Sequence, residues 1–223
     1  MTSSSADPAR EADADRLSAQ SLAHGDATGW FERLYAEAEA GTAQVPWDVG
    51  APTPLLVSWP VPAGDGRRAL VVGAGLGRDA EFVAAQGWTT IAFDISETAV
   101  RMARDRFPGS AVTYVVADLF DPPATWRHGF DLVVESNTVQ ALPRDLRTRA
   151  TAAVADLVAP GGTLLVLAAA IAVASEHGPP WPLTRDELDA FATSGLSAGP
   201  VEQHPSTGDP LALRWRALFH RPA

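Results

Sequence analysis

The fold is indicated by one stretch, Leu70-Val71-Val72-Gly73-Ala74-Gly75-Leu76-Gly77-Arg78-Asp79, in which an apolar segment runs into a glycine-rich turn. Ala69–Val72 is a continuous apolar run, which suits a strand buried on both faces. The pattern then predicts a helix over 79–86, ended by Gly87. The glycines therefore lie on a strand-to-helix turn, where backbone without Cβ can approach a ligand and free N–H groups favour polar or anionic groups.

A carboxylate follows the next predicted strand. Residues 88–93 form an apolar run, and Asp94 lies at its carboxyl end, where it can accept hydrogen bonds from both hydroxyls of a ribose. Arg78 occupies the place of the third glycine in the dinucleotide fingerprint, which disfavours the pyrophosphate of NAD or FAD. The stretch therefore predicts a site for a nucleoside without phosphates, such as S-adenosylmethionine.

The composition excludes several other chemistries. The 223 residues suit one medium α/β domain, and the formal net charge of −10 opposes a nucleic-acid or anionic-membrane partner. The chain contains no cysteine, which excludes disulfides, thiolate metal sites and cysteine nucleophiles. All 17 basic residues are arginine, so a lysine Schiff base and a Walker lysine are excluded too. We expect a small-molecule partner and a monomer.

The location of the protein is expected to be cytoplasmic. The N-terminus lacks the apolar core of a secretory signal, and its acidic residues disfavour a transit peptide. The most apolar run, Thr163–Ala174, is shorter than the ~20 residues that a membrane span requires. We therefore expect no membrane partner and interpret this run as a central strand with its exit loop.

The chain is expected to comprise a flexible tail over 1–27 and a single domain over 28–223. The tail has few large apolar residues and cannot offset the entropy of ordering. Within the domain, residues 28–60 would form a cap: aromatic and leucine residues at helical spacing predict a helix over 30–40, and prolines predict a shaped loop over 46–55 with a short helix to 59. Residues 61–223 would form the α/β core.

The core region alternates strand and helix signals. After the first two strands, strands are predicted over 112–116, 130–134 and 163–169, and helices over 96–107, with Ser96 as N-cap, and 144–158. This alternation implies βαβ units and a parallel sheet with right-handed crossovers. A capping box at Thr184–Glu187 opens a helix to about residue 194, and alternation over 211–219 predicts a half-buried final strand, with Leu213, Trp215, Ala217 and Phe219 on one face.

Three acids end predicted strands, namely Asp94, Asp118 and Glu135. Ligands bind at the carboxyl ends of parallel strands, although such acids can instead cap the following helices. His177, in the loop Glu176–Trp181, is a candidate proton carrier, and an ordinary loop histidine is the alternative. No histidine or acid cluster has metal-ligand spacing, so we expect no metal site.

Several separate motifs resemble class I S-adenosylmethionine-dependent methyltransferases, and specifically the thiopurine, thiol and halide methyltransferase family. These motifs are Pro46-Trp47-Asp48-x-Gly50-x-x-Thr53-Pro54-Leu55, Gly73-x-Gly75-x-Gly77-x-Asp79, Asp94-Ile95-Ser96, Pro160-Gly161-Gly162 and Gly178-Pro179-Pro180. The match spans roughly residues 29–216. The Pro-Trp-Asp loop upstream of the glycine turn is its most specific part.

The resemblance implies a Rossmann-like α/β fold, with helices on both faces of a seven-stranded, mostly parallel sheet, an antiparallel last strand and an N-terminal helical cap. It also implies the residues that bind the cofactor. Trp30 and Trp47 would cover it, Gly73 would meet its amino-acid tail, Asp94 its ribose, and Asp118 with Leu119 its adenine. The other cofactor-binding residues would be Gly75, Gly77, Ile95 and Glu135. The alternative for both tryptophans is an ordinary core position.

The predicted reaction is transfer of the sulfonium methyl to a small soft nucleophile, a thiol in preference to a halide, by in-line displacement without an obligatory base. Glu135-Ser136-Asn137 departs from the family, and polar groups there favour an acceptor larger than a halide. Three alternatives remain: methylation of oxygen or nitrogen with Glu135 or His177 as base, a non-catalytic nucleoside-binding module, and an NAD-dependent oxidoreductase. Lid material over 30–59 and 176–183 favours an enzyme over a binding module.

Overall fold

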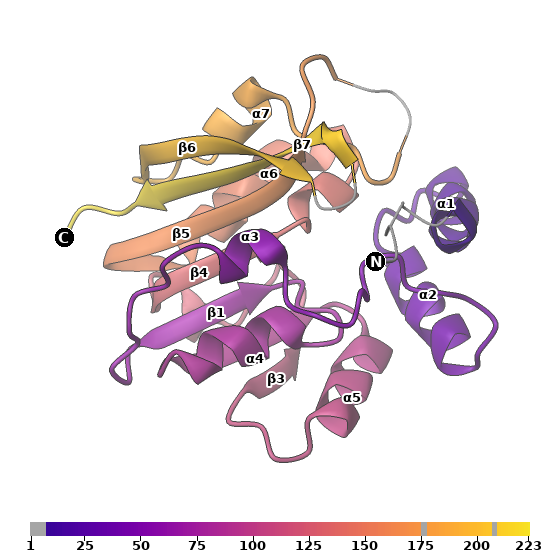
Figure 1. The fold of residues 1–223 in the computed structure, drawn as a ribbon, viewed down its shortest axis with the longest axis horizontal. Coiled ribbons are helices and arrows are strands. Elements are labelled where there is room, and N and C mark those ends of the chain that lie inside the picture. The colour runs from indigo at the N-terminus through magenta and orange to yellow at the C-terminus, as the bar shows by residue number, and fades with distance from the viewer. Residues whose placement is uncertain (1–7, 175–177, 207–208) are drawn as a thin grey trace.

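The computed structural model describes residues 8–174, 178–206 and 209–223, and it contains a seven-stranded sheet in the order β3-β2-β1-β4-β5-β7-β6 (Figure 1). The strands are β1 (Arg68–Val72), β2 (Thr89–Asp94), β3 (Thr113–Val116), β4 (Phe130–Ser136), β5 (Val158–Ala170), β6 (Ser197–Ser206) and β7 (Asp209–His220). Strands β1 to β5 are parallel, and β7 is antiparallel to both of its neighbours, β5 and β6. The expected sheet with a reversed last strand is confirmed.

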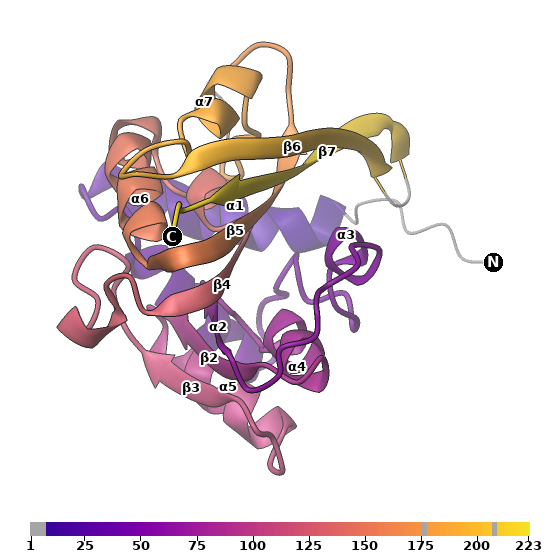
Figure 2. The ribbon, with the colours of Figure 1, turned by 90° about the vertical axis from the view of Figure 1, so that its left-hand side faces the viewer.

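Helices cover both faces of the sheet (Figure 2). One face packs against α3 (Pro54–Val57), α4 (Arg78–Ala85) and α5 (Glu97–Arg106), and the other packs against α6 (Arg144–Asp156) and α7 (Arg185–Asp189). Short 3-10 turns lie at η1 (Ala124–Trp126) and η2 (Val139–Ala141). Most of the central strand residues are buried, as their continuous apolar runs predict.

Local sequence signals account for several helix boundaries. The Ser96 hydroxyl accepts a hydrogen bond from Ala99 N and caps α5, as predicted. The capping box formed by Thr184 and Glu187 is present at α7, but this helix ends at Asp189 and not near residue 194. Strand β5 begins at Val158, five residues before the predicted start. Val158 already pairs with Phe130 of β4, and a shift in register separates this pair from the regular pairing that starts at Thr163.

The last two strands depend on long-range pairing. Trp215, Ala217 and Phe219 of β7 are buried as predicted, whereas Leu213 is 40% exposed and does not join their cluster. Strand β6 pairs with β7 and forms one edge of the sheet. Local alternation did not indicate this strand, and only the seven strands implied by the family resemblance accounted for it. Among the described residues, no helix has both the length and the apolar character needed to cross a membrane.

The N-terminal region differs from the expected flexible tail. Residues Pro8–Ala23 form helix α1, which packs against α2 (Gly29–Glu39) through the buried side chains of Ala14 and Leu17. A few apolar residues are enough to stabilise α1, because α2 supplies the apolar surface against which they are buried. This tertiary contact stabilises the helix although its composition is mostly polar. In Figure 1 this helix pair lies beyond the carboxyl ends of the central strands. Residues 1–7 lie outside the described part of the chain.

Candidate functional site

The sheet register brings the predicted site residues to one edge. Val72 pairs with Phe93 on β2 and with Glu135 on β4, and Asp94 pairs with Val116 on β3. The glycine turn after β1 therefore lies between the carboxyl ends of β2 and β4. This is the edge at which parallel α/β sheets bind ligands.

Asp94 supports the glycine turn directly. Its Oδ2 accepts a hydrogen bond from Gly75 N at 2.8 Å, and its Oδ1 accepts one from Ser96 N at 3.0 Å. Burial raises the pKa of this carboxyl, although the backbone N–H groups act in the opposite direction. Backbone N–H groups occupy only part of the acceptor capacity of this carboxylate, so it can accept a further hydrogen bond. Asp94 thus both braces the backbone and offers acceptors for hydroxyl groups.

The glycines of the turn are required by the chain's own side chains. Gly73, Gly75 and Gly77 all have φ in the left-handed region, at +57°, +50° and +87°. A Cβ at these positions would collide with Thr138, Tyr35 and Tyr114 respectively. The glycine requirement is thus already explained by internal packing, without a ligand.

The cap meets the glycine turn through a tyrosine and a tryptophan. Trp47 Nε1 donates a hydrogen bond to the Tyr35 hydroxyl at 2.8 Å, and this hydroxyl lies against Gly75. Trp47 remains 40% exposed, whereas Trp30 is 2% exposed and stacks on Phe31. Trp47 therefore lies beside the turn, while Trp30 occupies a core position in the cap. The sequence pattern suggested only a packing role for Tyr35.

Two acids fix the Pro-Trp-Asp loop. Asp79 accepts hydrogen bonds from Thr53 N at 2.7 Å and from Thr53 Oγ1 at 2.9 Å. Asp48 forms ion pairs with Arg78 at 3.2 Å and with Arg106 at 3.0 Å. The arginine that replaces the third fingerprint glycine thus has a structural partner in the loop.

Glu135 is the most buried acid at the edge. Its Oε1 accepts a hydrogen bond from Val139 N at 2.9 Å, and among the described residues its Oε2 has no hydrogen-bond partner. Burial raises the pKa of this carboxyl to about 7, against the opposing effects of backbone N–H groups and Arg214. A buried acceptor without a partner is costly, so this oxygen suits a donor supplied by a ligand.

The polar residues after β4 differ in how far their groups are satisfied. Gln140 Oε1 accepts a hydrogen bond from Ala169 N at 2.7 Å, so this amide has a structural role. Asn137, at φ +62°, donates to Ser136 Oγ and accepts a hydrogen bond from Arg214. Sequence reasoning missed Arg214 because it lies on a reversed strand, far along the chain from the other edge residues.

The remaining predicted residues lie at the edge with fewer contacts. The Asp118 carboxylate accepts a hydrogen bond from Phe120 N at 2.8 Å, Leu119 is buried and Ile95 is 37% exposed. His177 lies outside the described residues, as does part of the predicted lid over 176–183. The described residues include no group of histidine and acid side chains that could hold a metal ion.

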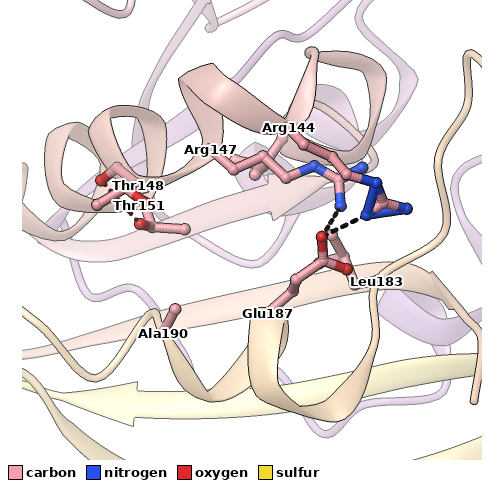
Figure 3. A pocket seen from close by; sticks show the side chains of 8 residues that line it. Arg144, Arg147, Thr148, Thr151, Leu183, Glu187 and Ala190 are labelled. Carbon is pink, nitrogen blue, oxygen red and sulfur yellow. Dashed lines mark hydrogen bonds and ion pairs between the residues drawn. The ribbon is translucent and has the colours of Figure 1, made fainter. Parts of the chain in front are cut away.

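A separate pocket of about 130 Å³ lies between α6 and α7 (Figure 3). Glu187 bonds both Arg144 and Arg147 there, and Arg147 also donates to Trp181 O at 2.6 Å. These contacts anchor the segment that follows β5. The lining of this pocket includes none of the residues predicted to bind the cofactor.

The thiopurine S-methyltransferase family model matches residues 37–210. The chain belongs to this family. The thiocyanate methyltransferase 1 of Brassica oleracea is 31% identical over 191 residues, covering 78% of this chain and 80% of the relative. The probable thiol methyltransferase 2 of Arabidopsis thaliana is 29% identical over 211 residues, covering 85% of this chain and 92% of the relative.

Solved structures agree on the fold. The N-methyltransferase NodS from Bradyrhizobium japonicum WM9, in complex with S-adenosyl-L-homocysteine, aligns with a TM-score of 0.63 at 17% identity and covers 86% of this chain and 97% of NodS. This thiopurine S-methyltransferase family member is thus an enzyme of the class I methyltransferase fold, and its cofactor is S-adenosylmethionine. The oxidoreductase and binding-module alternatives are not favoured.

The residues at the edge fit this cofactor. Asp94 can accept further hydrogen bonds, as a ribose requires, and Glu135 Oε2 is a buried acceptor that an ammonium group would satisfy. Both features are carboxylate oxygens, which suit hydroxyl and ammonium groups and not a phosphate. The fit is therefore to a nucleoside that carries an amino-acid tail.

Proposed function

We propose that this enzyme transfers the methyl group of S-adenosylmethionine to the sulfur of a small thiol. The observation that carries the proposal is the family membership, together with relatives named for thiocyanate and thiol methylation. The polar edge around Glu135 and Asn137 supports an acceptor with hydrogen-bonding groups in preference to a bare halide.

The proposed cofactor contacts follow the geometry of the edge. Asp94 and Ile95 would meet the ribose, Asp118 and Leu119 the adenine, and Glu135 the ammonium group. Trp47 would cover the cofactor from the cap, beside Gly73, Gly75 and Gly77. Trp30 would act indirectly, because it packs inside the cap and supports Tyr35 and Trp47.

In the proposed reaction, the protein mainly positions the reacting groups and excludes water from them. Bound S-adenosylmethionine supplies an electrophilic methyl group on a sulfonium. Charge decreases when a thiolate approaches a sulfonium, so a site that aligns the reacting atoms and excludes water accelerates the displacement. The cap and the Pro-Trp-Asp loop, held by Asp79 and Asp48, would provide this enclosure.

The acceptor class can be tested by steady-state kinetics. Purified protein with labelled S-adenosylmethionine would be given iodide, thiocyanate, and aliphatic and aromatic thiols, with methylated products quantified. We expect the thiols to have the highest kcat/KM. Iodide turning over faster than every thiol would contradict the proposal.

Methylation of oxygen or nitrogen is a second candidate because Glu135 carries an unpartnered oxygen and a pKa of about 7. Such a carboxylate could accept the proton of a neutral acceptor. Small phenols and amines in the same assay decide between the two. A phenol that outperforms all thiols, and whose turnover Glu135→Gln abolishes while S-adenosylhomocysteine still binds, would favour this second function.

We further propose that residues 28–60 act as a cap on a core formed by 61–223, and that the enzyme works as a cytoplasmic monomer on small molecules without nucleic-acid or membrane partners. The acidic net charge of −10 supports the absence of nucleic-acid binding. Sedimentation of the purified protein tests the monomer, and a dimer at micromolar concentration would contradict it.

A further inference from the structure

Arg214 brings a cationic side chain to the carboxyl edge from the far side of the sheet. It lies in the middle of β7, close to where this strand begins to pair with β5, and it is paired with Ala169 of β5 and His204 of β6. Its side chain donates a hydrogen bond to the Oδ1 of Asn137, which follows β4. The guanidinium therefore reaches across β5 toward the residues that separate the glycine turn from the last hairpin.

The guanidinium of Arg214 has no carboxylate in contact with it among the described residues. Arg214 is partly buried. Burial lowers its pKa, while Glu135 and Asp79 raise it from a longer distance. By contrast, Arg216 on the same strand pairs with Glu202 at 2.6 Å.

A desolvated guanidinium without a contacting anion is an unfavourable arrangement that an anionic ligand relieves. Arg214 has five N–H donors, and its hydrogen bond to Asn137 leaves a planar fork of donors that matches a carboxylate. The amide of Asn137 fixes the orientation of the guanidinium. The remaining donors of Arg214 are therefore available to bind an anion.

We propose that Arg214 binds a carboxylate on the acceptor, so that the substrates of this enzyme are thiols bearing a carboxylate that does not react. This inference rests on the proposed thiol methylation. It assigns recognition of that carboxylate to one residue.

The charge changes of the reaction explain why the bound anion is not the thiolate. The thiolate sulfur forms a bond to the methyl carbon as the carbon–sulfonium bond breaks, and the electron pair of that bond passes to the departing sulfur. The negative charge of the thiolate disappears, so a guanidinium on that sulfur would stabilise the ground state more than the transition state. A separate carboxylate keeps its charge, and binding it lowers KM without lowering kcat.

A matched pair of acceptors tests the proposal, namely 3-mercaptopropionate and its neutral analogue 3-mercaptopropionamide. For the unmodified enzyme we expect the KM of the carboxylate to be about 10- to 100-fold below that of the amide, which is the range for a charge-assisted contact. Arg214→Met should remove this KM difference while kcat changes far less. Arg214→Lys should retain part of it, and Arg216→Met, on the same strand and face, should leave the ratio intact.

Calorimetric titration with S-adenosylhomocysteine shows whether each variant is folded and whether Arg214 serves the cofactor. We expect Arg214→Met to bind S-adenosylhomocysteine within about threefold of the unmodified enzyme. A parallel loss of cofactor affinity would assign Arg214 to the cofactor carboxylate and overturn the inference, as would equal KM values for the two thiols in the unmodified enzyme. If the unmodified enzyme methylates neither thiol but methylates another class, the proposed function itself fails.

Discussion

At the scale of single residues, Asp94 braces the glycine turn, and we propose that it also binds the ribose of the cofactor. It braces Gly75 and Ser96 through backbone N–H groups, and it offers acceptors to a ribose. We predict that Asp94→Ala weakens S-adenosylhomocysteine binding by roughly 10- to 100-fold, since a hydrogen bond to a charged group contributes about 1.5–3 kcal/mol. Calorimetry measures the affinity, and NAD serves as the ligand expected not to bind. A folded Asp94→Ala protein with unchanged affinity would contradict the role.

Glu135 predicts a pH dependence of stability. Its folded pKa of about 7 lies above the ordinary value of 4.5, so ionisation disfavours the folded state. Its stabilising contribution is complete below about pH 4.5 and is lost as the pH rises through 7. Relative to the unmodified protein, Glu135→Gln should gain on the order of 3 kcal/mol between these limits.

Urea unfolding of both proteins at pH 5 and pH 8 measures this difference and removes the contributions of all other groups. A difference in unfolding free energy that does not change with pH would show that Glu135 titrates normally. Bound S-adenosylhomocysteine should reduce the effect, because an ammonium near Oε2 favours the ionised carboxylate.

At the scale of elements, the cap is joined to the core by carboxylates. Glu32 of α2 accepts hydrogen bonds from Ser96 Oγ at 2.6 Å, Thr98 Oγ1 at 2.6 Å and Thr98 N at 3.1 Å, all at the start of α5. Burial alone would raise the pKa of Glu32, but these hydrogen bonds outweigh it and hold the pKa below its ordinary value. The contact is therefore present at neutral pH and is lost as the pH falls through the lowered pKa.

Trypsin provides a direct test of the cap, because the chain has no lysine and Arg33 is its only cleavage site between residues 17 and 66. We predict that S-adenosylhomocysteine slows cleavage at Arg33, because we propose that the cap orders over the bound cofactor. Glu32→Ala should accelerate it on the order of tenfold. Glu39→Ala is the matched control, because its ion pair with Arg101 is exposed and contributes little. Equal cleavage with and without saturating ligand would show that the cap is not coupled to the cofactor site.

Sequence patterns predicted those elements that depend on local chemistry. The continuous apolar strands, the Ser96 cap and the Thr184 capping box all arise from residues close together in the chain. Helix α1 and strand β6 could not be predicted in the same way, because each is stabilised by a partner element and not by its own pattern. The same reason separates Asp94, which follows a strand, from Arg214 and Tyr35, which reach the site only through tertiary packing.

At the scale of the whole molecule, the N-terminal helices pack against Leu76 of the glycine turn and Ala99 of α5, so we expect this region and the sheet to unfold together. We predict a single cooperative transition for the full chain, and S-adenosylhomocysteine at 100 times its Kd should raise the unfolding free energy by about 2.7 kcal/mol. Calorimetric scans with and without ligand measure both quantities. Two separate transitions, of which only one responds to the ligand, would show that the cap folds independently.

The reversed direction of β7 affects how this enzyme can diversify. Because β7 runs against its neighbours, its first residues, and not its last, arrive at the carboxyl edge, and they do so at the margin of the sheet beside β6. Exchanges there leave β1, β2 and β3 untouched, together with the turns that follow them. We therefore expect that substitutions in the final hairpin can change the acceptor preference of the enzyme while the glycine turn and Asp94 keep their geometry.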